Sequence, residues 1–151
     1  MRTITREIVA AVIYSRDGKL FQVRQAQKER NVYPGLWGIV GGGIDKGETQ
    51  RQALDREVIE EAGIDISQYP AELIDGSVGE AEKTLKDSGE RVLCKMNFHT
   101  YKVIISDKDA DSIEITLNDE HTEYRWTTPP ELRELELTPP SVELFTKLGY
   151  L

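Results

Sequence analysis

Three glutamates lie close together in one segment of the chain: Glu57, Glu60 and Glu61. Residues three and four apart share one face of an α-helix, so this spacing predicts three carboxylates along one helical edge. Carboxylates that close repel one another unless positive charge lies among them. Oxygen ligands suit Mg²⁺ or Mn²⁺, and a group without Cys or His disfavours zinc. The spacing therefore indicates a divalent-cation site.

A glycine run and an arginine flank these glutamates. Gly41, Gly42 and Gly43 precede the expected helix, and glycine lets backbone carbonyls and N–H groups approach a ligand closely. Arg56 comes directly before the first of the three glutamates. Its rigid five-donor guanidinium could orient Glu48 or another carboxylate.

The simpler interpretation is a solvated acidic helix. For an isolated Glu-x-x-Glu-Glu that interpretation would be favoured about four to one, because Glu is common and favours helices. The glutamates belong to a longer pattern, which argues against the simpler interpretation. This pattern fixes seven residues: Gly42, Glu48, Arg56, Glu57, Glu60, Glu61 and Gly63. With each residue type at roughly 5–7% usage, the pattern would match by chance about once in several million such chains.

The segment from Gly42 to Ile64 resembles the Nudix box, G-x5-E-x7-R-E-U-x-E-E-x-G-U, where U is a bulky aliphatic residue. Every fixed position matches: Gly42, Glu48, Arg56, Glu57, Val58, Glu60, Glu61, Gly63 and Ile64. The resemblance implies an α/β (α+β) fold, in which a Nudix-type α/β/α sandwich holds a mixed sheet between helices. It also implies a Mg²⁺-dependent hydrolase, with Mn²⁺ as a substitute, that splits a phosphoanhydride in a nucleoside polyphosphate. A nucleoside triphosphate would give the monophosphate and pyrophosphate.

The resemblance also implies a metal site. Glu57 and Glu61 would be the principal ligands, and Glu60 an additional ligand or a water-activating group. The carbonyl of Gly41 or Gly42 could complete the metal shell.

Members of this family often add one acid from a downstream loop, and Glu120 looks like that acid. Asp119 and Glu123 are the other candidates for this acid. An exposed acidic loop without a catalytic function is an alternative of about equal weight. Arg56 and Glu48 would be structural and orienting residues.

Four residues outside the box are candidates for binding the substrate. Tyr33 and Trp37 could stack on a nucleobase, although core packing is the more common use of such rings. Arg24, which ends a strand, could meet phosphate or form a surface ion pair. Lys95 could reach a pocket from its strand.

The elements that must position these residues follow from the apolar pattern. The Thr49–Gln52 pair fits a capping box, and Gly63 is a natural helix stop. The pattern predicts loops over 25–33 and 79–89, and helices over 49–62, from 128, and over 138–148. It predicts strands over 4–14, 19–24, 71–78, 91–105, 113–117 and 123–126.

Composition restricts the other possibilities. With 151 residues the chain fits one domain, residues 1–151. The net charge of −8 and the lack of a basic cluster argue against a nucleic-acid partner. No apolar run is long enough to span a membrane, and a single cysteine, Cys94, fits a cytoplasmic protein. A homodimer is an open possibility.

The substrate is less restricted than the reaction. The chain length, the Tyr33–Trp37 segment and the C-terminal layout look like a bacterial branch that hydrolyses pyrimidine deoxynucleoside triphosphates. The alternatives are Nudix hydrolases of oxidised purine nucleotides, nucleotide sugars, dinucleoside polyphosphates or dihydroneopterin triphosphate. A Nudix module that senses a nucleotide without cleaving it is another alternative, but this chain keeps every acid of the box.

Overall fold

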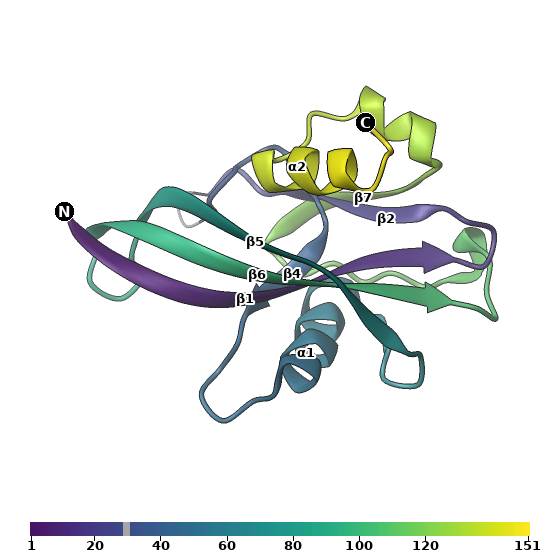
Figure 1. Ribbon diagram of the computed structural model, residues 1–151, viewed down its shortest axis with the longest axis horizontal. Helices are drawn as coiled ribbons and strands as arrows, with labels where there is room; N and C mark the ends of the chain where they lie inside the picture. The colour runs from purple at the N-terminus through teal and green to yellow at the C-terminus, as the bar shows by residue number, and fades with distance from the viewer. Residues whose placement is uncertain (29–30) are drawn as a thin grey trace.

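The protein is a curled mixed sheet with a helix on each side, as seen in a computed structural model that describes residues 1–28 and 31–151 (Figure 1). The main path of the sheet runs β3-β2-β1-β6-β5, while β4 pairs with β1 and β7 pairs with β2. The strands are β1 (Arg2–Ser15), β2 (Leu20–Gln25), β3 (Trp37–Gly38), β4 (Val40–Gly43), β5 (Ala71–Thr84), β6 (Arg91–Ile105) and β7 (His121–Thr127). The expected α/β/α sandwich is confirmed.

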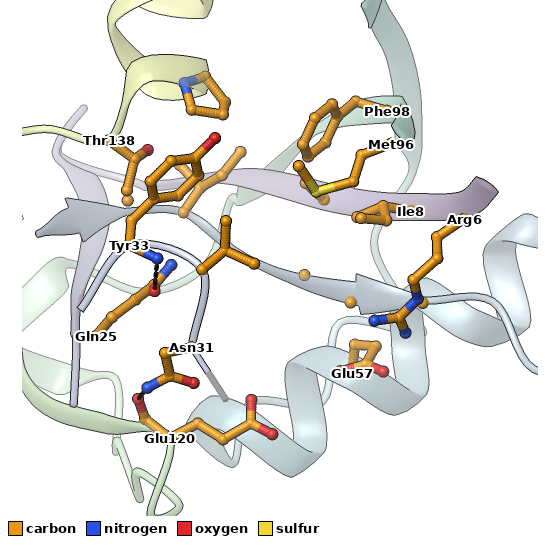
Figure 2. A pocket seen from close by; sticks show the side chains of 18 of the residues that line it. Arg6, Ile8, Gln25, Asn31, Tyr33, Glu57, Met96, Phe98, Glu120 and Thr138 are labelled. Atoms are coloured by element: carbon orange, nitrogen blue, oxygen red, sulfur yellow. Dashed lines mark hydrogen bonds between the residues drawn. The ribbon is translucent and has the colours of Figure 1, made fainter. Parts of the chain in front are cut away.

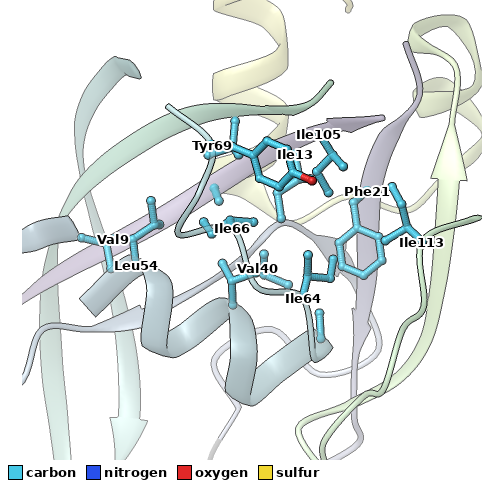
Figure 3. Packing of buried hydrophobic residues seen from close by; sticks show 14 of the residues in the cluster. Val9, Ile13, Phe21, Val40, Leu54, Ile64, Ile66, Tyr69, Ile105 and Ile113 are labelled. Atoms are coloured by element: carbon cyan, nitrogen blue, oxygen red, sulfur yellow. The ribbon is translucent and has the colours of Figure 1, made fainter. Parts of the chain in front are cut away.

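Strand β1 divides the interior into two layers, because alternate residues of a strand point to opposite faces of the sheet. Val9, Ala11 and Ile13 are fully buried in the cluster beneath helix α1 (Gln50–Ala62), which Figure 3 shows. Val12 faces the opposite way and packs with Phe145 of helix α2 (Pro139–Lys147). Figure 1 shows the two helices on opposite sides of the sheet.

Helix α1 begins and ends where its local sequence dictates. The Thr49 hydroxyl accepts the N–H of Gln52 at 3.1 Å, and the Gln52 side chain accepts the N–H of Thr49 at 2.9 Å. Gly63 ends the helix with a left-handed φ of 70°, a conformation that glycine adopts at little cost. Leu54 and Val58 are fully buried. Each contributes about 1.5–3 kcal/mol by removing its side chain from water.

Strands β1 and β6 run parallel over their whole length, and this register builds one wall of the site. Ile8 lies opposite Phe98, and Ala10 lies opposite Thr100. Along its other edge, β1 pairs with β4, where Ala10 lies opposite Gly41. The glycine run is thus a strand beside β1.

The structure corrects three of the expected elements. Strand β5 continues to Thr84, so only 85–90 connect it to β6. The segment 113–117 is not a strand; its apolar side chains pack on the core while its backbone stays irregular. The element from 128 is a short 3-10 helix (Pro129–Glu134). Part of the expected loop 25–33, residues 29 and 30, lies outside the described residues.

No helix in the described part of the chain has both the length and the hydropathy needed to cross a membrane.

Candidate active site

Glu57 and Glu61 lie one helical turn apart on the side of α1 that faces the sheet. They continue the buried stripe formed by Leu54 and Val58. Glu61 is only 2% exposed, and its Oε1 accepts the backbone N–H of Gly41 at 3.2 Å. The helix therefore carries two carboxylates into the protein interior beside β4.

The glycines of β4 leave space for this arrangement. A Cβ at position 41 would collide with the backbone of β1, so the close pairing with Ala10 requires glycine. A Cβ at position 42 would occupy the place of the Glu57 carboxylate. Gly42 therefore allows Glu57 to lie against the strand.

Arg56 connects this glutamate to the loop before the helix. Its guanidinium donates two hydrogen bonds to Glu48, at 2.7 and 2.9 Å, and one to the carbonyl of Gly43 at 2.9 Å. It also donates to Glu57 at 2.8 Å and to Glu60 at 3.2 Å. The hydrogen bond from Arg56 is the main reason that the pKa of Glu48 is lowered. Arg56 thus links the middle of α1 to the glycine strand and to the loop before the helix.

The two inner carboxylates have little compensating charge. Burial raises the pKa of Glu61 well above its ordinary value; the negative charge of Glu57 adds to the rise, and the Gly41 N–H opposes it. Burial also raises the pKa of Glu57, and this effect outweighs the opposing contact with Arg56. A bound cation would stabilise the charged form of these two buried carboxylates.

The donor set fits a hard divalent cation. Glu57 and Glu61 supply adjacent oxygens, and the backbone of Gly41 and Gly42 lies next to them. Among the residues that the structure describes, no three Asp, Glu, His or Cys side chains already surround one point. Glu60 does not join the inner pair: its side chain is 53% exposed and contacts Arg56. A cation would therefore be held first by Glu57 and Glu61, with backbone carbonyls or water completing its shell.

These carboxylates open into a pocket of about 570 Å³, which is within the size range of small-molecule sites. Its apolar wall includes Ile8, Met96 and Phe98, which extend from β1 and β6 (Figure 2). In Figure 2 the ring of Tyr33 lies on the left of the pocket, and Glu57 lies at its lower right. Burial raises the pKa of Tyr33, in agreement with a ring that is largely removed from water.

Glu120 is the acid of the downstream loop that lines the same pocket. Figure 2 shows its carboxylate turned toward the pocket interior, and its charge contributes to the raised pKa of Glu61. Its two competitors are engaged elsewhere, Asp119 with Lys28 at 2.9 Å and Glu123 with Arg24 at 3.4 Å.

The structure separates the four candidates for substrate binding. Tyr33 lines the pocket, whereas the other three do not. Trp37 is 7% exposed and packs in the interior. Arg24 donates to the carbonyl of Gly35 and pairs with Glu123. Lys95 lies on the opposite face of β6 from Met96 and approaches Glu80 at 3.7 Å.

Much of the pocket lining was not predicted from the sequence, including three side chains that can carry positive charge: Arg6, Lys83 and His121. The signal for Arg6 is its even-numbered position, two residues before Ile8 in the same strand, which places both side chains on one face. His121 follows Glu120 directly, and its Nε2 lies 3.9 Å from Glu61 Oε1. Burial lowers the pKa of His121 to about 4, so the imidazole beside Glu61 is neutral at pH 7.

Comparison with known proteins identifies the family of the chain. The family model described as NUDIX domain matches residues 4–148. The nucleoside triphosphatase NudI of Enterobacter sp. (strain 638) is 29% identical over 148 residues, which cover 97% of this chain and 98% of that protein. The protein of the same name from Escherichia coli K12 is 30% identical over 132 residues, which cover 87% and 88%.

Solved structures share the fold. The dihydroneopterin triphosphate pyrophosphohydrolase of E. coli superposes with a TM-score of 0.66 at 19% identity, covering 95% of this chain and 96% of that chain. The NUDIX domain of Shewanella oneidensis NrtR, crystallised with ADP ribose, gives 0.66 at 16% identity, with coverages of 97% and 87%. The family match over nearly the whole chain, together with the paired glutamates beside the glycine strand, leads to one assignment: the chain belongs to the NUDIX family and is a Nudix hydrolase.

Proposed function

We propose that this enzyme hydrolyses a nucleoside triphosphate to the monophosphate and pyrophosphate, with Mg²⁺ held by Glu57 and Glu61. The observation that carries the proposal is the Glu57–Glu61 pair, which opens into a nucleotide-sized pocket and in which burial raises the pKa of both carboxyl groups. The names of the NudI relatives support a triphosphate substrate. Mn²⁺ would substitute for Mg²⁺, because both accept oxygen ligands.

The bound cation would offset the charge of the phosphates and lower the pKa of a water molecule. The protein residues position the reactants. Arg56 keeps Glu57 against Gly42, so that the carboxylate faces the pocket rather than solvent. Glu120 lines the pocket and has no ion pair with another described residue, so its carboxylate is free to accept a proton from the attacking water. Glu60, which is exposed, is the alternative acceptor.

The nucleoside would occupy the apolar part of the pocket. Tyr33 and Phe98 offer ring surfaces there, and aromatic stacking on a base contributes about 1–3 kcal/mol. We propose pyrimidine deoxynucleoside triphosphates as the first substrates to assay, because the sequence layout resembles that branch.

The proposal is tested by a substrate panel with Mg²⁺, in which the released phosphate and pyrophosphate are measured separately. The panel contains pyrimidine and purine triphosphates, a nucleotide sugar, a dinucleoside polyphosphate and dihydroneopterin triphosphate. We expect pyrophosphate release from a triphosphate at low enzyme concentration. Product release from none of these compounds would favour a sensing module and refute the proposal.

The site assignment is tested by Glu57→Gln and Glu61→Gln, which keep the side-chain shape but remove the charge. We expect a loss of about 10²–10³-fold in kcat, equivalent to about 3–4 kcal/mol of transition-state stabilisation. Glu114→Gln is the matched control, because Glu114 is exposed and does not line the pocket. Wild-type turnover in both site variants would overturn the assignment.

A further inference from the structure

Arg6 is a cation in the pocket wall. It is partly buried on β1, lines the pocket with Ile8, and makes no ion pair within 4 Å with another described residue. Its guanidinium lies over Gly43, where a Cβ would collide with Nη2. Figure 2 shows the guanidinium directed toward the side of the pocket that holds Glu57. By contrast, Arg2 on the same strand is exposed and pairs with Glu90 at 2.8 Å.

Lys83 is a second cation of this kind. It projects from β5, is partly buried, lines the same pocket, and likewise has no acid within 4 Å in the described ranges. Burial lowers the pKa of Lys83, and the charge of Arg6 lowers it further. The two cations therefore lie close enough for their charges to interact, and the charge of Glu120 acts on Lys83 in the opposite direction. Like charges that are partly removed from water are unfavourable unless an anion occupies the space between them.

We propose that Arg6 and Lys83 bind the terminal phosphates of the substrate, and so form a subsite that selects a polyphosphate chain. The inference rests on the proposed function for the identity of the nucleotide, but not for the binding of phosphate. Guanidinium and ammonium groups are the usual partners of phosphate oxygens, and Arg can bind two of them at once. The acidic pair binds the cation on one side, and the two basic residues neutralise the outer phosphates on the other.

The subsite determines which anhydride bond is broken. With the outer phosphates at Arg6 and Lys83 and the nucleoside near Tyr33, the anhydride between the α- and β-phosphorus would lie between these two ends, on the side of the pocket that holds Glu57. Water attacks one phosphorus of this anhydride, and the bond from that phosphorus to the bridging oxygen breaks. The water oxygen stays on the attacked phosphorus, the bridging oxygen leaves with the other product, and the proton of the water passes to a base, so that the products are the monophosphate and pyrophosphate. Nucleoside monophosphates would not reach the cationic subsite.

The test uses inorganic pyrophosphate, so that it does not depend on the nucleobase. Its affinity for the intact protein is measured by calorimetry in the presence of Mg²⁺. We expect Arg6→Gln and Lys83→Gln each to weaken binding about tenfold or more, and Arg6→Lys to recover part of the loss. Arg2→Gln and Lys19→Gln are matched controls, because both residues lie outside the pocket and pair with other acids. Both should bind like wild type.

A second measurement separates a phosphate subsite from general loss of affinity. Once a triphosphate substrate is known, KM for it should rise in the Arg6 and Lys83 variants, while the affinity for its monophosphate stays within about twofold. Wild-type protein that does not bind pyrophosphate, or a folded Arg6→Gln/Lys83→Gln variant that binds it as tightly as wild type, overturns the inference. If the double variant does not fold, the test compares Arg6→Lys, which keeps the positive charge, with Arg6→Gln, which removes it. Equal pyrophosphate affinity of these two variants and wild type then overturns the inference. Failure of the proposed function would instead appear as absent turnover in protein that still binds pyrophosphate.

Discussion

The burial of Glu61 has a measurable consequence for the stability of the metal-free protein. Its carboxyl group is 2% exposed, and its folded pKa is raised well above the ordinary value by burial and by Glu57. At Glu61 the native state therefore holds more protons than the unfolded state from about pH 4.5 upward, until the pH passes the folded pKa. As a result, the free energy of unfolding falls as pH rises toward the folded pKa of Glu61. We expect Glu61→Gln to remove most of this fall.

The magnitude follows from linkage. One proton of difference between the native and unfolded states changes stability by about 1.4 kcal/mol per pH unit. For a protein of this size, 1 kcal/mol corresponds to about 2–4 °C in Tm. The Tm of metal-free wild type should therefore fall by up to about 3–6 °C per pH unit between the unfolded and the folded pKa of Glu61, whereas Glu61→Gln should give a flatter line.

His121 changes the stability with pH in the opposite direction to Glu61, and this limits the pH range in which Glu61 can be studied alone. Its folded pKa of about 4 lies below its ordinary value near 6.5, so its contribution rises with pH and is complete above about pH 6.5. Above about pH 6.5 the contribution of His121 is constant, so a remaining fall in Tm with pH, measured in a chelator, reports Glu61.

The same variant tests the cation. Mg²⁺ at about 100 times its Kd should stabilise wild type by about 2.7 kcal/mol, and a tenfold loss of affinity would reduce this to about 1.4 kcal/mol. Glu61→Gln should thus be the more stable protein in chelator at pH 8 and should gain less from Mg²⁺. Equal pH slopes for the two proteins, with equal Mg²⁺ responses, would refute the argument that Glu61 is a buried charge awaiting a cation.

Two further predictions concern the elements that hold the site. Gly42→Ala should displace the Glu57 carboxylate, so kinetics should show kcat lowered at least tenfold. Thermal unfolding should show a change in Tm of only a few degrees. An unchanged kcat would contradict the close approach of Glu57 to Gly42. Thr49→Ala should lower the free energy of unfolding by about 1 kcal/mol in a urea titration, because the capping box of α1 is lost; Ser at position 49 should restore it.

The sequence predicted α1 and its caps because their determinants are local. Spacings of three and four residues place Glu57 and Glu61 on one face, and the Thr49–Gln52 pair needs only the first helical turn. Strand β1 was predicted from its content of Ile and Val, and the predicted segment 91–105 is β6 to the residue.

Alternating apolar residues indicate which side chains are buried, but not which backbone groups pair by hydrogen bonds. This explains the main error in the predicted fold, the strand expected over 113–117. The segment 113–117 has buried apolar side chains, yet Thr116 donates its N–H to the carbonyl of Ala62 at the end of α1 rather than to a strand. The continuation of β5 to Thr84 was missed for the converse reason. Its polar residues pair with β6, and that partner is distant in the sequence.

The composition of the pocket depends on tertiary structure. The parallel register of β1 and β6 puts Arg6 opposite Met96, so even-numbered residues of β6 face the pocket and Lys95 faces away. The sequence could not choose among the acids of the downstream loop, because the choice depends on how β7 joins β2. The sequence by itself determined the paired carboxylates, since one helix carries both. Only the folded sheet decided which cations face them, because strand register and pairing join residues that are far apart in the chain.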